Sequence, residues 1–148
     1  MIGLLQRVRS AAVSVDGGVI ASIGCGILVL VGVERDDGPA QVERLAQRLL
    51  GYRVFADSDG KMNLSVCDID GGILLVPQFT LAADTEKGMR ASFTSAAAPA
   101  QGRFLFELLA ETMRARHRSI AIGAFGADMQ VALVNDGPVT FLLRVPAS

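Results

Sequence analysis

Two short polar stretches, each placed at the end of an apolar run, are where this sequence could do chemistry. The first, Pro77-Gln78-Phe79-Thr80, follows the apolar run Leu74–Val76. The second, Asn135-Asp136-Gly137-Pro138, joins the apolar runs 129–134 and 139–145. A buried strand that ends in Gln and Thr places an amide and a hydroxyl at the rim of a core. Asn-Asp-Gly-Pro predicts a compact turn between two buried strands, with its backbone presented to a ligand.

Few side chains are available for acid–base or metal chemistry. The sequence has one histidine, His117, and no His/Cys/carboxylate cluster with metal-ligand spacing. It has neither a Gly-x-Ser-x-Gly elbow nor a phosphate-binding glycine-rich loop. Thr80 is a candidate nucleophile, but its hydroxyl would need an adjacent base, so a hydrogen-bonding or structural role is the alternative. An enzyme built from these residues must catalyse a reaction that needs little acid–base help, and we expect neither metal nor organic cofactor.

Backbone and amide groups at the first stretch could still stabilise developing charge. The N–H groups around Gln78, Phe79 and Thr80 are candidate oxyanion donors, and loss of one such donor typically costs about 10²–10³ in rate. Pro77 cannot donate, because it has no N–H. Gln78 could hold the substrate, or it could be a residue at the rim of the core whose hydrogen bonds are all made within the protein. Phe79 is more often a core residue, although it could stack on a base.

Hydrophobic periodicity predicts the elements that position these residues. Strands are expected over 4–15, 19–23, 27–31, 52–55, 73–78, 129–134 and 139–145. One amphipathic helix opens at Asp37-Gly38-Pro39, and a second runs from Gly102 to Arg118. Its expected buried side comprises Phe104, Leu105, Leu108, Leu109, Thr112 and Met113. Residues 82–98 form a long loop, a feature that is usually functional or disordered. The order predicts an α/β fold with one compact domain over residues 1–148, with mixed β-sheets in layers and two helices packed on one side.

Composition is that of a globular protein, with 51% apolar and 20% charged residues. No apolar run approaches the roughly 20 residues that span a bilayer, so we expect a cytoplasmic protein without a membrane partner. Cys25 and Cys67 are expected to be buried free thiols, with a disulfide or a metal site as the alternative. The formal net charge of −1 is a caution for any nucleic-acid partner. The cations that could form a patch are Arg7, Arg9, Lys87, Arg90, Arg114, Arg116, His117 and Arg118, although the last four could be a solvated helix end.

The two polar stretches together resemble the signature of D-aminoacyl-tRNA deacylases, whose motifs read Ser-Gln-Phe-Thr-Leu and Asn-x-Gly-Pro-Val-Thr. The second motif matches fully at residues 135–140, and the first matches at 78–81 with Pro77 in place of Ser. The similarity extends over segments 1–15, 60–64, 83–93 and 126–131, and in effect over the whole chain. It implies a layered fold of helices, sheet and second sheet, assembled as a homodimer with active sites at the subunit interface.

The resemblance also implies how such an enzyme would select its substrate. In the family the Gly-Pro step, here Gly137-Pro138, is cis and enters the active site of the other subunit. Its carbonyl oxygens occupy the position that the side chain of an L-amino acid would take, so D-amino acids of any side chain are accepted. Glycine would pass as well. Arg7 matches the residue that holds this step in place, and Asn135 belongs to the same motif. Without the matching residues Arg7 and Asn135, the Gly137-Pro138 step would indicate only an ordinary turn.

Pro77 is the departure from the family pattern. A related animal-type group has Pro-Gln-Ala-Thr-Leu at this place, tolerates a small L-amino acid and has its Gly-Pro step in trans. This chain shares the proline but retains Phe79, Val139 and Arg7 of the D-specific group. The expected activity is therefore cleavage of the ester at the 3′ end of D-aminoacyl-tRNA. The neighbouring ribose hydroxyl would assist in place of a side-chain nucleophile. The alternatives are a non-catalytic nucleic-acid-binding protein on the same fold and a hydrolase of another small ester.

Overall fold

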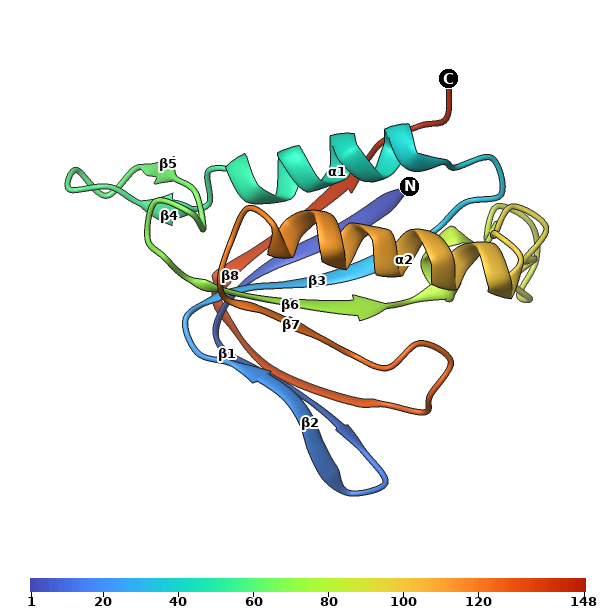
Figure 1. The fold of residues 1–148 in the computed structure, drawn as a ribbon, viewed down its shortest axis with the longest axis horizontal. Helices are drawn as coiled ribbons and strands as arrows, with labels where there is room; N and C mark the ends of the chain where they lie inside the picture. The colour runs from blue at the N-terminus through green and yellow to red at the C-terminus, as the bar shows by residue number, and fades with distance from the viewer.

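The first strand, β1 (Ile2–Val15), organises the sheet in the computed structural model, which describes residues 1–148. Along one edge it pairs with β3 (Gly26–Gly32) and then with β2 (Gly18–Ile23). Along its other edge it pairs with β8 (Gln130–Arg144) over almost its full length. All three pairings are antiparallel. A strand this long bends, and the sheet curls with it (Figure 1).

The strand that leads to the first polar stretch is β6 (Gly72–Pro77), which lies parallel to β3. On its other side it pairs in parallel with β7 (Ile120–Ile122). The sheet order is β2-β1-β3-β6-β7, with β8 on the free edge of β1. Residues 73–76 are all buried, as expected for a parallel strand covered on both faces. A separate two-stranded sheet joins β4 (Phe55–Ala56) to β5 (Met62–Leu64).

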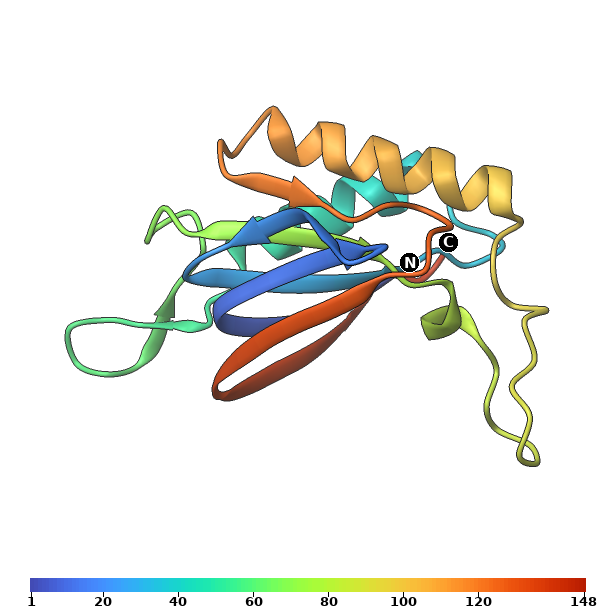
Figure 2. The same ribbon diagram turned by 90° about the horizontal axis from the view of Figure 1, so that it is seen from below.

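Two helices cover one face of the sheet, as the sequence predicts. They are α1 (Pro39–Gly51) and α2 (Pro99–Arg114), and each begins with a proline, whose missing N–H needs no partner in the first turn. Figures 1 and 2 show the two helices side by side on the same side of the strands. The predicted α/β fold with two helices on one side is confirmed.

The sheet separates two apolar clusters. The larger one lies between the sheet and the helices and includes Leu45, Leu49, Leu105, Leu109, Ile73 and Leu75. The smaller one comprises Val8, Ala11, Val13, Leu28, Leu74 and Val76. Successive strand residues point to opposite faces, so Ile73 and Leu75 face the helices while Leu74 and Val76 face away. Apolar side chains of β2, β7 and β8 pack on this second face.

The C-terminal strands differ from the sequence prediction. The two runs form one strand, β8, and Asn135-Asp136-Gly137-Pro138 is an irregularity within it, where the register against β1 shifts on either side of Val8. The strand is also largely exposed in the single chain, with Leu133, Val134 and Leu142 all on the surface. The prediction of a turn between two buried strands is therefore wrong.

Several single residues and element boundaries also differ from the sequence prediction. Phe104 on α2 is 58% exposed, not buried with Leu105, Leu109 and Met113. The two cysteines are free, as expected, but both are exposed. The expected loop 82–98 is preceded by a short 3₁₀ helix, η1 (Phe79–Ala82). Helix α2 starts at Pro99 and ends at Arg114, so Arg116 and Arg118 follow it. No helix is long and apolar enough to cross a membrane.

Candidate active site

Strand β6 delivers the Gln78-Phe79-Thr80 triplet to the carboxyl end of the sheet. The Gln78 N–H donates to the Val31 carbonyl at 2.8 Å, which extends the β3–β6 ladder by one bond beyond Pro77. The chain then turns away into η1, whose Leu81 N–H donates to the Gln78 carbonyl at 3.2 Å. The Gln78 side-chain amide donates to the Thr80 hydroxyl. That hydroxyl makes no contact with a carboxylate or imidazole, so no base is placed to activate it.

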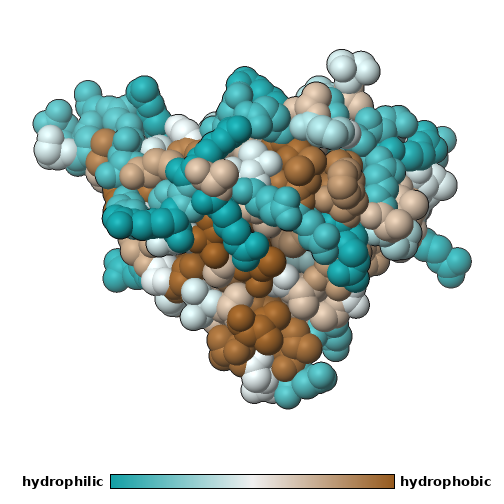
Figure 3. Space-filling model, in the orientation of Figure 1, coloured by the Kyte–Doolittle hydropathy of each residue, from teal (hydrophilic) through white to brown (hydrophobic).

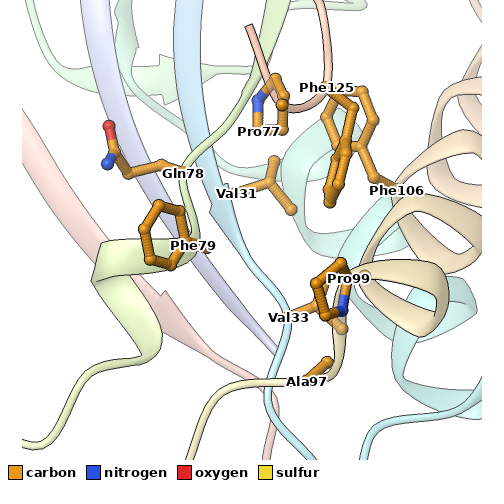
Figure 4. A pocket seen from close by; sticks show the side chains of 11 residues that line it. Val31, Val33, Pro77, Gln78, Phe79, Ala97, Pro99, Phe106 and Phe125 are labelled. Carbon is orange, nitrogen blue, oxygen red and sulfur yellow. The ribbon is translucent and has the colours of Figure 1, made fainter. Parts of the chain in front are cut away.

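An apolar pocket opens beside this triplet, with a volume of about 250 Å³. It lies between the ends of β3 and β6, the N-terminal part of α2 and the connection from β7 to β8 (Figure 4). Its walls include Val31, Val33, Pro77, Gln78, Phe79, Ala97, Pro99, Phe106 and Phe125. Figure 4 shows the Gln78 side chain on the side of the pocket away from Phe106 and Phe125. The site thus has an apolar wall on one side and a polar rim on the other.

Phe79 is not a core residue. It is 60% exposed, and its ring packs against Phe93 with the centroids 5.3 Å apart. The expectation that favoured burial is wrong because η1 carries Phe79 outward at the end of the strand. An exposed aromatic pair at the mouth of a pocket is available for stacking.

The second polar stretch is held by Arg7 and Asn135. The Arg7 Nε donates to the Asp136 carbonyl at 3.0 Å, and its Nη1 donates to the Val54 carbonyl at 2.7 Å. The Asn135 amide donates to the carbonyls of Arg7 and Val139, both at 2.9 Å. The Gly137–Pro138 peptide bond is cis, and Gly137 has a φ of +133°. A β-carbon at Gly137 would lie 2.8 Å from the Val139 side chain and 3.0 Å from Arg7, so only glycine fits.

The two groups of predicted site residues lie at opposite ends of the sheet within one chain. Arg7 pairs with Ile27 near the beginning of β3, whereas Pro77 pairs with Val31 near its end. Four residues of strand correspond to about 13 Å. Figure 2 shows the same separation between the bend of β8, in red, and the green segment that carries η1. The structure therefore brings Pro77, Gln78, Phe79 and Thr80 together, and it brings Arg7, Asn135, Gly137 and Pro138 together, but it does not unite the two groups.

Comparison with known proteins identifies the group to which this arrangement belongs. The family model described as D-Tyr-tRNA(Tyr) deacylase matches residues 4–144. The chain belongs to the D-Tyr-tRNA(Tyr) deacylase family. A D-aminoacyl-tRNA deacylase of Methylococcus capsulatus is 62% identical over 146 residues, covering 99% of this chain and 95% of that protein. One from Nitrosococcus oceani is also 62% identical over 146 residues, with coverages of 99% and 94%.

Solved structures share the fold. One described as a c-Myc DNA Unwinding Element Binding Protein has a TM-score of 0.95 and 40% identity, covering 99% of this chain and 100% of that chain. A second, described as a probable eukaryotic D-amino acid tRNA deacylase, has a TM-score of 0.80 and 18% identity, with coverages of 96% and 97%. At that identity the second likeness concerns the fold alone.

The two arginines that follow α2 in this deacylase-family chain, Arg116 and Arg118, form ion pairs with carboxylates of the same chain. Arg116 forms two hydrogen bonds to Glu43, at 2.7 and 2.8 Å, and these lower the pKa of Glu43. Arg118 hydrogen-bonds Asp70 and lowers its pKa.

His117 is buried, with Nε2 2.6 Å from the Gly71 carbonyl and Nδ1 3.7 Å from Cys67 Sγ. Partial burial, and then the charge of Asp68, raise the pKa of the Cys67 thiol. No group of three or more His, Cys, Asp or Glu side chains could hold a metal ion.

Sequence reasoning missed several residues that line the pocket of this deacylase-family chain. Phe106 and Phe125 form its apolar wall, and their rings lie 6.5 Å apart. Phe125 belongs to an irregular segment without periodicity, so no pattern marked it. Ala97 belongs to the long loop, whose length pointed to a function but not to a particular residue.

Proposed function

We propose that this chain hydrolyses the ester of D-aminoacyl-tRNA to free D-amino acid and tRNA, with residues 1–148 acting as one deacylase unit. The observation that supports it most is the family match over residues 4–144, together with an apolar pocket beside Gln78, Phe79 and Thr80. Hydrolysis adds water to the ester carbonyl and returns the ribose oxygen as a hydroxyl, so no oxidant, metal or second substrate is needed.

The pocket would take the 3′-terminal adenosine, with the ester at its polar rim. An apolar wall of Val31, Phe106 and Phe125 suits a flat base, and Gln78 can both donate and accept hydrogen bonds. Phe79 and Thr80 are the first residues of η1, where backbone N–H groups have no partner within the helix. Aimed at the ester, these N–H groups would stabilise the oxyanion of the tetrahedral intermediate.

Thr80 would act as a positioning group in this mechanism. Its hydroxyl accepts a hydrogen bond from Gln78, and no base contacts it. The ribose hydroxyl beside the ester would help to place or activate the attacking water, which requires proximity more than a side-chain base. The protein would then contribute orientation and hydrogen-bond donors.

Rejection of L-aminoacyl-tRNA would come from the Gly137-Pro138 carbonyls of a second copy. The support is geometric: within one chain the Arg7–Gly137 group and the Gln78 group lie at opposite ends of β3. A second copy could bring them together in a homodimer. Arg7 holds the Asp136 carbonyl, and the Asn135 amide ties this stretch to the carbonyls of Arg7 and Val139, while a further bond to Val54 fixes Arg7 itself. A rigid backbone wall rejects one configuration without reading the side chain, so glycine would also be accepted.

Nucleic-acid binding without catalysis is the second candidate. It is favoured by the 40% identity to a protein described as binding a DNA unwinding element. The formal net charge of −1 and the internal pairing of Arg116 and Arg118 count against a broad basic surface.

Deacylation of matched D-tyrosyl-, L-tyrosyl- and glycyl-tRNA tests the proposal, with a chelated sample and a Gln78→Ala variant as controls. We expect release of D-tyrosine and glycine, retention of L-tyrosine, no effect of the chelator and slow hydrolysis by the variant. Comparable release of L-tyrosine would contradict the rejection wall. No release from any of the three, together with salt-dependent binding of DNA or RNA, would favour the second candidate.

A further inference from the structure

The loop that follows η1 forms a hairpin beside the pocket. Its strands meet where Asp84 and Ser92 exchange backbone hydrogen bonds of 2.8 and 2.9 Å, and Gly88 lies near its tip with a φ of +70°. In Figure 2 this segment projects away from the body of the molecule. We define residues 84–92 as the 84–92 hairpin. Along the chain it lies between two pocket-lining residues, Phe79 and Ala97, and Phe93, which follows it, packs on Phe79 at the mouth of the pocket.

The cations on this hairpin are free, whereas most others are not. Ion pairs within 4 Å engage Arg7, Arg9, Arg35, Arg103, Arg116, Arg118 and Arg144. Lys87 and Arg90 are exposed and pair with no carboxylate. The hairpin also contains Asp84 and Glu86, and the Asp84 carboxylate accepts the Glu86 N–H at 2.9 Å at the hairpin base. The unpaired positive charge that lies nearest the pocket along the chain is therefore that of Lys87 and Arg90.

An apolar surface connects the pocket with this positive charge. Phe93, which follows the hairpin, is 48% exposed and packs on Phe79 at the pocket mouth. Met89, next to Arg90, is fully exposed. Aromatic faces next to cations are the combination that binds single-stranded nucleic acid, with bases stacked on the rings and phosphates near the cations. An exposed methionine adds adaptable apolar surface.

We propose that the 84–92 hairpin with Phe93 is the binding track for the single-stranded 3′ end of the tRNA. A base next to the terminal adenosine stacks on Phe93, and the phosphates that precede it lie against Lys87 and Arg90. This rests on the proposed function, because the terminal adenosine must occupy the pocket for its neighbours to reach the hairpin. Four residues separate the Asp84–Ser92 pair from Gly88, so at the strand rise of about 3.3 Å per residue the hairpin reaches at most about 13 Å, the length of a few nucleotides.

The test compares a Lys87→Ala/Arg90→Ala variant with a control that loses two exposed cations without a carboxylate partner that do not line the pocket, Arg44→Ala/Lys61→Ala. The substrates are D-tyrosyl esters of tRNA, of the trinucleotide CCA and of adenosine alone. We expect the hairpin variant to raise KM about tenfold for tRNA and CCA at unchanged kcat, and to leave the adenosine ester unaffected. The slope of log K against log salt for CCA-ended RNA should fall by about 1.4, since each phosphate contact on a single strand contributes about 0.7.

The control variant should behave as the wild type on all three esters. Phe93→Ala should raise KM for the trinucleotide and tRNA by about tenfold through lost stacking, again sparing the adenosine ester. Equal KM in wild type and hairpin variant would overturn the proposal, as would an equal loss on the adenosine ester, which would indicate a damaged pocket. An effect confined to whole tRNA would overturn the single-strand assignment. If the wild type hydrolyses none of the esters, the proposed function fails, and the salt slope for uncharged CCA-ended RNA still decides the role of the hairpin.

Discussion

At the scale of single residues, the candidate site contains amides, backbone groups and a hydroxyl, with no acid–base pair. Gln78 contacts Thr80, and Arg7 and Asn135 contact backbone carbonyls. The sequence pointed to Gln78 and Thr80 because they end an apolar run, and the resemblance to the deacylase motifs pointed to Arg7 and Asn135. The sequence was insufficient for Phe79, because a ring next to a buried strand can point either way, and the direction depends on η1.

Thr80 and Gln78 are expected to contribute unequally to the rate. Thr80→Val retains the shape but removes the hydroxyl, and we expect kcat for D-tyrosyl-tRNA to fall about tenfold or less. One neutral hydrogen bond is worth about 0.5–1.5 kcal/mol, and 1.36 kcal/mol is about tenfold in rate. Gln78→Ala should be the more damaging change, because it would also remove the proposed contact of Gln78 with the substrate. Single-turnover kinetics measures both, and a Thr80→Val enzyme without residual activity would identify a covalent nucleophile instead.

The ion pair between Arg118 and Asp70 leads to a prediction about the dependence of stability on pH. The Arg118 hydrogen bond lowers the pKa of Asp70, so the native state favours the ionised carboxylate. A lowered native pKa contributes stability above the ordinary value of about 3.9, and this contribution is lost as the pH falls through the lowered value. Carboxyl chemical shifts followed by NMR should show Asp70 titrating below the ordinary aspartate range. In Arg118→Ala the titration should return toward it, and an unchanged Asp70 titration would show that the pair is absent in solution.

At the scale of elements, periodicity located the helices and most strands but not the path of β8. Asn-Asp-Gly-Pro is typical of a turn, yet β1 is long enough to pair on both sides of it. Pairing with β1 therefore overrides the local preference and leaves an irregularity inside one strand. Periodicity also placed Phe104 on the buried side of the second helix, whereas the side chain is mostly exposed. The helical stripe that packs on the sheet is narrower than the apolar stripe in the sequence.

The buried and exposed positions of α2 should contribute differently to the free energy of unfolding. Leu109 is fully buried between α2 and the sheet, so Leu109→Ala should reduce the free energy of unfolding by about 2–5 kcal/mol. Phe104→Ala on the same helix should cost less than about 1 kcal/mol, because little burial is lost. Urea unfolding of the two variants compares them directly. Equal costs would mean that Phe104 is covered in solution.

At the scale of the whole molecule, the single chain exposes apolar surface that a small soluble protein rarely leaves open. Val134 and Leu142 of β8 are more than half exposed. Figure 3 shows a hydrophobic patch over the β1–β2 hairpin, and Val19 and Ile20 of β2 are exposed. Such patches mark interfaces, and under the proposed function a second copy would bring together the two site groups that lie apart along β3. Composition could predict neither the exposed apolar surface nor the separation of the two site groups, because it does not distinguish core residues from interface residues.

An interface on β8 predicts that a charge there separates the subunits. Leu142→Asp should shift the protein from dimer to monomer and abolish discrimination or activity, whereas Phe104→Asp on the outer face of α2 should leave the dimer intact. Light scattering coupled to size exclusion reports the mass of each. A dimeric Leu142→Asp protein would place the interface elsewhere.

A mixed dimer of one Gln78→Ala chain and one Arg7→Ala chain, purified with two different tags, tests most directly whether two subunits share each site. If each site combines the pocket of one subunit with the Gly137-Pro138 wall of the other, one of the two sites is intact. The mixed dimer should then hydrolyse D-tyrosyl-tRNA at about half the wild-type rate and leave L-tyrosyl-tRNA untouched, since its one functional pocket faces an unmodified Arg7. Hydrolysis of L-tyrosyl-tRNA at about half the rate of the Arg7→Ala homodimer would show that pocket and wall belong to the same chain, and would contradict a site shared between subunits.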